Sequence, residues 1–155
     1  MTVTVAVESD AWASLPDLEE FAQRAALAAL AAADAAEGEL NLLFADDAAV
    51  AALNAKWRGK IGPTNVLSFP APGDLPVPNG EERPLGDVVL AHGVVAREAA
   101  EQGKTLRDHA THLIVHGVLH LLGYDHESEA EAGRMERIEI EILKGLGIPD
   151  PYERH

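Results

Sequence analysis

The sequence contains no cysteine. Disulfides and thiolate metal sites are therefore excluded, and any metal site must use nitrogen and oxygen ligands. No apolar run approaches the length of about 18 residues that a membrane-spanning helix needs. The apolar residues near the N-terminus alternate with polar ones, and no basic segment precedes them. We therefore expect no signal peptide, no membrane partner and a cytoplasmic location.

Basic residues are also few. The chain has 12 Lys and Arg against 26 Asp and Glu, which gives a formal net charge of −14. Taken alone, this disfavours a nucleic-acid partner, because phosphate binding usually needs a basic face. The distribution qualifies this point, since Lys56, Arg58 and Lys60 stand together with no acid between them. Many acids fall on two predicted helical segments, 17–37 and 127–141, where charged faces are usually solvated.

The order of apolar patterns predicts one α/β (α+β) domain over residues 1–155. Expected strands cover 2–7, 40–45, 64–69 and 85–91, and expected helices cover 18–36, 46–57, 92–102, 106–122 and a last segment opened by a capping box at 128–131. The resulting order is β-α-β-α-β-β-α-α-α. The first β-α-β should form a parallel crossover, and the proline-rich loop 70–84 should join neighbouring strands. The prediction is a mixed four-stranded sheet packed with about five helices.

Three histidines in eleven residues indicate a metal site. His116 and His120 are four residues apart on a predicted helix, so they project from one face about one turn apart. Gly123 frees the backbone to turn, and His126 can then return to the same point. Three neutral ligands with a fourth position left for water are typical of a catalytic zinc site, so we expect one Zn²⁺ per chain. Nickel or another divalent metal suits the same donors.

Other residues near these histidines have alternative interpretations. A triad of His112, His116 and His120 converges poorly, because residues eight apart on a helix are separated by about 12 Å. His109 and His112 are therefore expected to be surface or buried, hydrogen-bonded residues, with cleft lining as the lesser alternative. Asp125 could equally orient a ligand histidine or stabilise the turn. Gly117 stands where H-E-x-x-H peptidases carry their glutamate base, which argues against a protease.

The motif of residues 116–126, His-Gly-Val-Leu-His-Leu-Leu-Gly-Tyr-Asp-His, resembles the signature of the YbeY-type endoribonucleases. Segments 54–60 (Asn-Ala-Lys-Trp-Arg-Gly-Lys), 63–70 (Pro-Thr-Asn-Val-Leu-Ser-Phe-Pro), 85–87 and 151–152 also resemble that family. The resemblance implies a zinc-dependent endoribonuclease specific for single-stranded RNA. It further implies roles in 3′-end maturation of 16S ribosomal RNA and in ribosome quality control, with the ribosomal small subunit or its proteins as partners and no DNA.

The same resemblance supports catalytic roles for Arg58 and His116. A guanidinium can grip the phosphate on which charge develops, and Lys56 and Lys60 would attract the RNA backbone beside Arg58. Trp57 is expected to anchor the end of its helix, with base stacking as the lesser alternative. No glutamate is assigned as general base.

The sequence leaves two further positions and two other functions open. Asn65, which stands where many relatives have Asp, and Ser68 could bind substrate or satisfy backbone groups. His92 is expected to begin a helix, with cleft lining as the lesser alternative. Another zinc hydrolase, or a non-catalytic ribosome-assembly factor with a zinc-stabilised fold, are the alternative functions.

Overall fold

A computed structural model describes residues 2–35, 37–72, 76–124 and 127–152. Its four strands form one mixed sheet in the order β1-β2-β4-β3. β1 pairs parallel with β2 and β2 parallel with β4, whereas β3 runs antiparallel to β4. The predicted parallel crossover and the pairing of the two strands that flank the proline-rich loop are both confirmed. The strands are β1 (Thr2–Val7), β2 (Glu39–Ala45), β3 (Val66–Pro70) and β4 (Pro84–Ala91).

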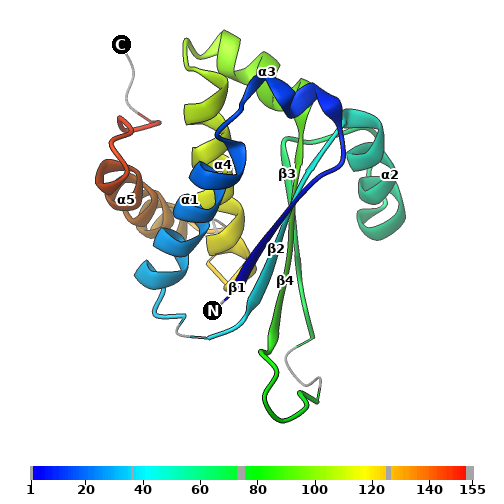
Figure 1. Cartoon of the computed structure of the whole chain (residues 1–155). Helices are drawn as coiled ribbons and strands as arrows, with labels where there is room; N and C mark the ends of the chain where they lie inside the picture. The colour runs from blue at the N-terminus through cyan, green and yellow to red at the C-terminus, as the bar shows by residue number, and fades with distance from the viewer. Residues whose placement is uncertain (1, 36, 73–75, 125–126, 153–155) are drawn as a thin grey trace.

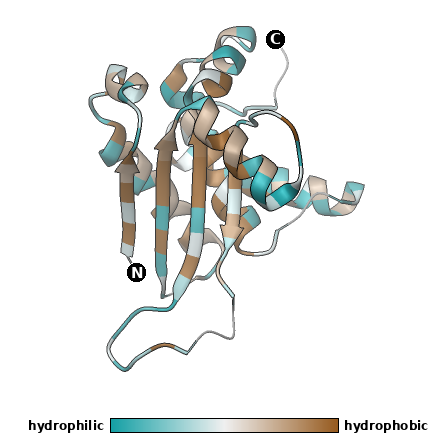
Figure 2. Ribbon diagram, turned by 90° about the vertical axis from the view of Figure 1, so that its right-hand side faces the viewer, coloured by the Kyte–Doolittle hydropathy of each residue, from teal (hydrophilic) through white to brown (hydrophobic). Residues whose placement is uncertain are grey.

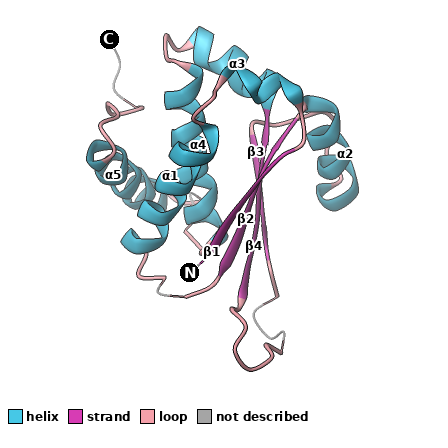
Figure 3. Cartoon of the chain, viewed as in Figure 1, coloured by secondary structure: helices cyan, strands magenta, loops and turns pink. Residues whose placement is uncertain are grey.

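Five α-helices cover the two faces of this sheet unequally. α1, α4 and α5 lie on one side of the sheet and α2 on the other, while α3 crosses near one end of the strands (Figures 1 and 3). This arrangement confirms the predicted fold class and element order. The helices are α1 (Leu18–Ala32), α2 (Asp47–Arg58), α3 (His92–Glu101), α4 (Leu106–Leu121) and α5 (Glu129–Gly145).

Alternating residues of the strands supply both halves of the core. On the face of α1 and α4, Leu40, Leu42 and Phe44 are fully buried. On the other face, residues of β2, β3 and β4 pack with Val50 of α2. The brown segments of the central strands in Figure 2 follow this burial, because strands covered on both sides read as nearly continuous apolar runs.

Helix boundaries follow the caps that the sequence carries. The side chains of Asp46, Thr105 and Ser128 accept hydrogen bonds from backbone N–H groups in the first turns of α2, α4 and α5. α1 ends earlier than predicted, at Ala32, because Asp34 takes a left-handed conformation (φ 57°) that stops the helix.

One element escaped prediction, a short 3-10 helix at Asp10–Ser14. It places Trp12 in the core, where the indole Nε1 donates a 2.9 Å hydrogen bond to the carbonyl oxygen of Ala45. His92 begins α3, as expected, and its ring packs edge-on against Trp12 at 5.0 Å between centroids.

The histidine helix α4 is the most enclosed of the five. It contacts α1, α3 and α5 as well as strands β3 and β4. Beyond its first turn, His116 and His120 are the residues of α4 that are partly exposed, and the others are buried.

No helix in the described parts of the chain is both long enough and apolar enough to cross a membrane.

Candidate functional site

Four histidines of α4 form a row along the helix. The ring centroids of His109 and His112 lie 6.2 Å apart, those of His112 and His116 also 6.2 Å, and those of His116 and His120 4.9 Å. His109 and His112 are buried, whereas His116 and His120 are partly exposed. The four-residue spacing thus brings His116 and His120 side by side where solvent can reach them. His126 and Asp125 lie outside the described residues.

His116 and His120 line a cavity of about 440 Å³ together with Arg58. Arg58 is the last residue of α2, and Gly59 ends that helix in a left-handed conformation (φ 64°). Residues 64–68 of the chain also line this cavity. The predicted phosphate-binding arginine and two of the predicted metal ligands therefore line the same cavity. Lys56 and Lys60 are exposed and do not line this cavity.

The expectation that Trp57 anchors the end of α2 is wrong. Its side chain is 63% exposed, and the ammonium group of Lys56 lies over the indole ring at 5.0 Å. α2 turns this position away from the sheet, because Val50 and Asn54 occupy its buried face. An exposed indole beside Arg58 is available to a ligand.

Gly117 lets α4 lie very close to the sheet. A Cβ atom at this position would stand 2.7 Å from Cγ1 of Val88 and 3.1 Å from Cγ2 of Val66. The carbonyl oxygen of Gly117 also accepts a 2.8 Å hydrogen bond from the hydroxyl of Ser68. No glutamate side chain fits there, so the peptidase-type base is excluded by packing as well as by sequence. Ser68 satisfies a backbone group, one of its two expected roles.

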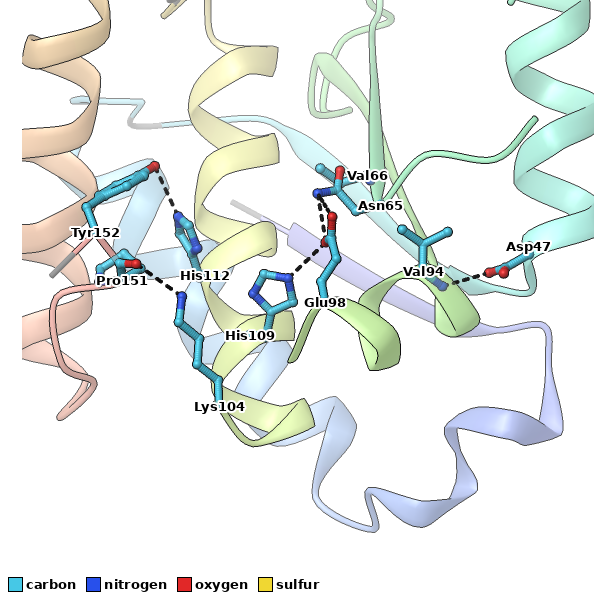
Figure 4. A network of polar contacts seen from close by, with 10 residues as sticks. All are labelled: Asp47, Asn65, Val66, Val94, Glu98, Lys104, His109, His112, Pro151 and Tyr152. Carbon is cyan, nitrogen blue, oxygen red and sulfur yellow. Dashed lines mark hydrogen bonds and ion pairs between the residues drawn. The ribbon is translucent and has the colours of Figure 1, made fainter. Parts of the chain in front are cut away.

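A second cavity, of about 800 Å³, also borders His116. Its wall carries a polar network in which Glu98 binds both neighbours: Nδ2 of Asn65 donates to it at 3.1 Å and Nε2 of His109 lies 3.0 Å away (Figure 4). Burial lowers the pKa of His109, although Glu98 opposes this shift. His109 and His112 are buried and hydrogen-bonded, as expected, and both also line the cavity.

Behind the histidines lies a carboxylate that sequence reasoning missed. Glu139 of α5 is fully buried, so the expectation of a solvated acidic face on segment 127–141 is wrong at this position. Its oxygens accept hydrogen bonds from Nδ1 of His116 and the hydroxyl of Tyr152, and Nε2 of His112 lies 3.5 Å away. Burial raises the pKa of Glu139, but these three partners outweigh burial and lower the pKa to about 2.

The spacing of apolar residues in α5 indicates that Glu139 lies on the buried face of the helix. Glu139 is four residues after Met135 and three before Ile142, which are both buried. These spacings place all three side chains on one helix face. His112, His116 and Glu139 each offer a ligand atom within 4.8 Å of the others, so the group could hold a metal ion.

Known proteins match almost the whole chain. The family model described as Endoribonuclease YbeY matches residues 6–147. The chain belongs to the YbeY family. It is 52% identical to the Endoribonuclease YbeY of Dinoroseobacter shibae, over 98% of this chain and 91% of that protein. It is also 52% identical to the one of Paramagnetospirillum magneticum, over 98% of both chains.

A solved structure shares the fold of this YbeY family member. The solution structure of TM1509 from Thermotoga maritima aligns over 98% of this chain and 99% of its own, with a TM-score of 0.55 and 22% identity. At that identity the likeness concerns the arrangement of the sheet and helices alone.

Proposed function

We propose that this protein is a zinc-dependent endoribonuclease that cleaves single-stranded RNA in the cytoplasm. Its substrate is the 3′ end of 16S ribosomal RNA, and its activity serves ribosome maturation and quality control on the small subunit. The observation that carries the proposal is the common cavity of Arg58, His116 and His120. Membership of the YbeY endoribonuclease family supports the reaction class.

The metal site in this proposal consists of His116, His120 and His126, with one zinc ion per chain. The two described ligands fit a catalytic metal, because neutral imidazoles suit zinc and both rings border a cavity that substrate can enter. A zinc ion bound there would supply Lewis-acid chemistry, by polarising a phosphoryl oxygen and lowering the pKa of a bound water. The same donors suit nickel, so metal analysis belongs to the test.

Arg58 is proposed to bind the phosphate at which the chain is cut. A guanidinium can form two parallel hydrogen bonds with phosphate oxygens, and the bonds strengthen as charge develops on them. Lys56 and Lys60 are exposed beside Arg58 and would attract the neighbouring phosphates. This cationic segment is a local binding site for RNA phosphates on a protein whose formal net charge is −14. The exposed ring of Trp57 can stack a base next to it.

Metal analysis of gently purified protein, paired with a ribonuclease assay, tests the proposal. We expect about one zinc per chain and cleavage of single-stranded RNA that stops with chelator and with His116→Ala. Arg58→Glu should abolish cleavage and leave the bound zinc unchanged. Arg134→Glu is the matched control, because it makes the same charge change at an exposed position of α5, away from the cavity.

Three outcomes would contradict the proposal. Cleavage retained by Arg58→Glu removes the arginine from the reaction. Turnover of peptides or nucleotides with RNA left intact indicates another hydrolase. Sedimentation with ribosomal particles, without cleavage by the pure zinc-loaded protein, indicates an assembly factor whose metal only stabilises the fold.

A further inference from the structure

The carboxylate of Glu139 is fully buried in the interior of the molecule. Glu139 has no exposed surface, although an unpaired charge in a protein interior is strongly unfavourable. Both of its oxygens are hydrogen-bonded: one accepts from Nδ1 of His116 and the other from the hydroxyl of Tyr152. The carboxylate is therefore held from two sides, by α4 and by the C-terminal segment.

The hydrogen bond to Glu139 determines which nitrogen of His116 carries the proton. An ionised carboxylate only accepts, so Nδ1 of the ring must be the donor. In the neutral ring the lone pair then resides on Nε2, the form in which an imidazole binds a metal.

His116 joins this buried group to the open cavity. Its side chain is 24% exposed, and it borders the cavity of Arg58 and His120 while it contacts the fully enclosed Glu139. One ring thus has a protein-facing and a cavity-facing side. A carboxylate behind a histidine ligand is the arrangement that orients the ring and raises its basicity in many zinc sites.

We propose that Glu139 is a positioning residue, which fixes the tautomer and orientation of His116 so that Nε2 faces the metal, and that Tyr152 holds Glu139 in place. The proposal rests on the metal site proposed above. It assigns to α5 and the C-terminal segment a part in metal affinity without contact with the metal or the RNA.

Burial argues against Glu139 as a ligand. Its carboxylate is fully enclosed and is in direct hydrogen-bond contact with Nδ1 of His116. An ion between the two groups would break this hydrogen bond in a place that solvent does not reach, whereas a catalytic zinc ion keeps one coordination position open to water or substrate.

Tyr152 is fixed by the segment around it. Its backbone N–H donates to Oδ1 of Asp150 at 2.8 Å, and Nζ of Lys104 donates to the carbonyl oxygen of Pro151 at 3.2 Å. The Tyr152 oxygen also lies 3.3 Å from Nε2 of His112 (Figure 4). Tyr152→Phe therefore removes one hydroxyl and leaves the remaining attachments of the segment.

Zinc affinity of the variants, measured by competition with a chromogenic chelator, tests the proposal without RNA. Glu139→Leu removes the acceptor and should weaken zinc binding about 10- to 100-fold, the range found for such outer partners. Glu139→Gln keeps an acceptor oxygen without the charge and should lose less, as should Tyr152→Phe. Glu141→Gln, an exposed change on the same helix, is the control and should bind like the parent. Dissociation constants within twofold of the parent in Glu139→Leu and Tyr152→Phe overturn the proposal.

The tautomer gives a second readout, which does not depend on how well the Glu139 variants fold. Imidazole ¹⁵N chemical shifts of the metal-free parent and of Tyr152→Phe should show His116 protonated at Nδ1 in the parent, and a mixture of tautomers in the variant. Protonation at Nε2 in the parent refutes the proposal.

A third variant tests Glu139 as a ligand. His112→Gln should keep its zinc and His120→Ala should lose it; the reverse result would make His112, His116 and Glu139 the ligands and overturn the positioning role. Because these measurements contain no RNA, a zinc-loaded parent that fails to cleave RNA refutes the proposed function and leaves this result intact.

Discussion

The hydroxyl of Ser68 donates a 2.8 Å hydrogen bond to the carbonyl oxygen of Gly117. This bond ties the middle of β3 to the helix that carries His116 and His120, at the one residue of that stretch with no side chain. Arg58 and the two histidines line the same cavity as Ser68. The distance between the arginine and the histidines therefore depends on how closely α4 approaches the sheet.

Gly117→Ala tests this close approach. Its methyl group would meet Val88 at 2.7 Å, so the helix must shift or the valine must move. We expect a loss of about 1–3 kcal/mol in the free energy of unfolding, as for other overpacked cores, together with weaker zinc binding. Urea denaturation and chelator competition measure the two effects.

Gly145→Ala is the matched control for that substitution. It adds the same methyl group on α5, where nothing lies within 4 Å. It should be neutral or stabilise the protein by up to about 1 kcal/mol through helix propensity. Equal stability of Gly117→Ala and the parent would show that the contact between α4 and the sheet is not tight.

Asn65→Asp tests why this chain has an amide at position 65. The Asn65 amide donates to Glu98, which also binds His109, whereas an aspartate would set two carboxylates against each other. We expect a loss of about 1–3 kcal/mol in the free energy of unfolding at neutral pH, from the lost donor and the repulsion. Asn79→Asp makes the same change at an exposed position and should cost little. Similar denaturation curves for the two variants would contradict a role of Asn65 as a donor.

The buried ring of His109 predicts a pH dependence of stability. Burial lowers its folded-state pKa below the ordinary 6.5, so the unfolded chain takes up a proton that the folded protein does not. The stability that this residue contributes is present above pH 6.5 and is lost as the pH falls from there through the folded-state pKa. His109→Gln should flatten the curve of unfolding free energy against pH in that window. Parallel curves for variant and parent would contradict this assignment.

Removal of the metal should lower thermal stability. Zinc at about 100 times its dissociation constant adds roughly 2.7 kcal/mol to a protein that binds it only when folded. For a chain of this length the gain corresponds to about 5–10 °C in melting temperature. Calorimetry with and without chelator measures the shift. His116→Ala should show none, and an equal shift in that variant would place the stabilising metal elsewhere.

Local patterns in the sequence were enough to predict the sheet, the order of its elements and the neighbouring positions of His116 and His120. Strand alternation, capping residues and a four-residue helical spacing are properties of short segments. They hold wherever those segments are placed in the fold. The exposure of Trp57 could not be predicted in this way, because it depends on which face of α2 meets the sheet.

The histidines of α4 and Gly117 could thus be placed from the sequence of a single helix. The hydrogen-bond partner of His116 could not. Glu139 stands 23 residues away on another helix, and Tyr152 lies at the far end of the chain. Both make these contacts only in the folded chain, since burial and hydrogen bonding of a carboxylate depend on groups that folding brings together. Short-range geometry determines where His116 and His120, the proposed ligands, lie, and the packed interior determines the hydrogen bonds that hold His116.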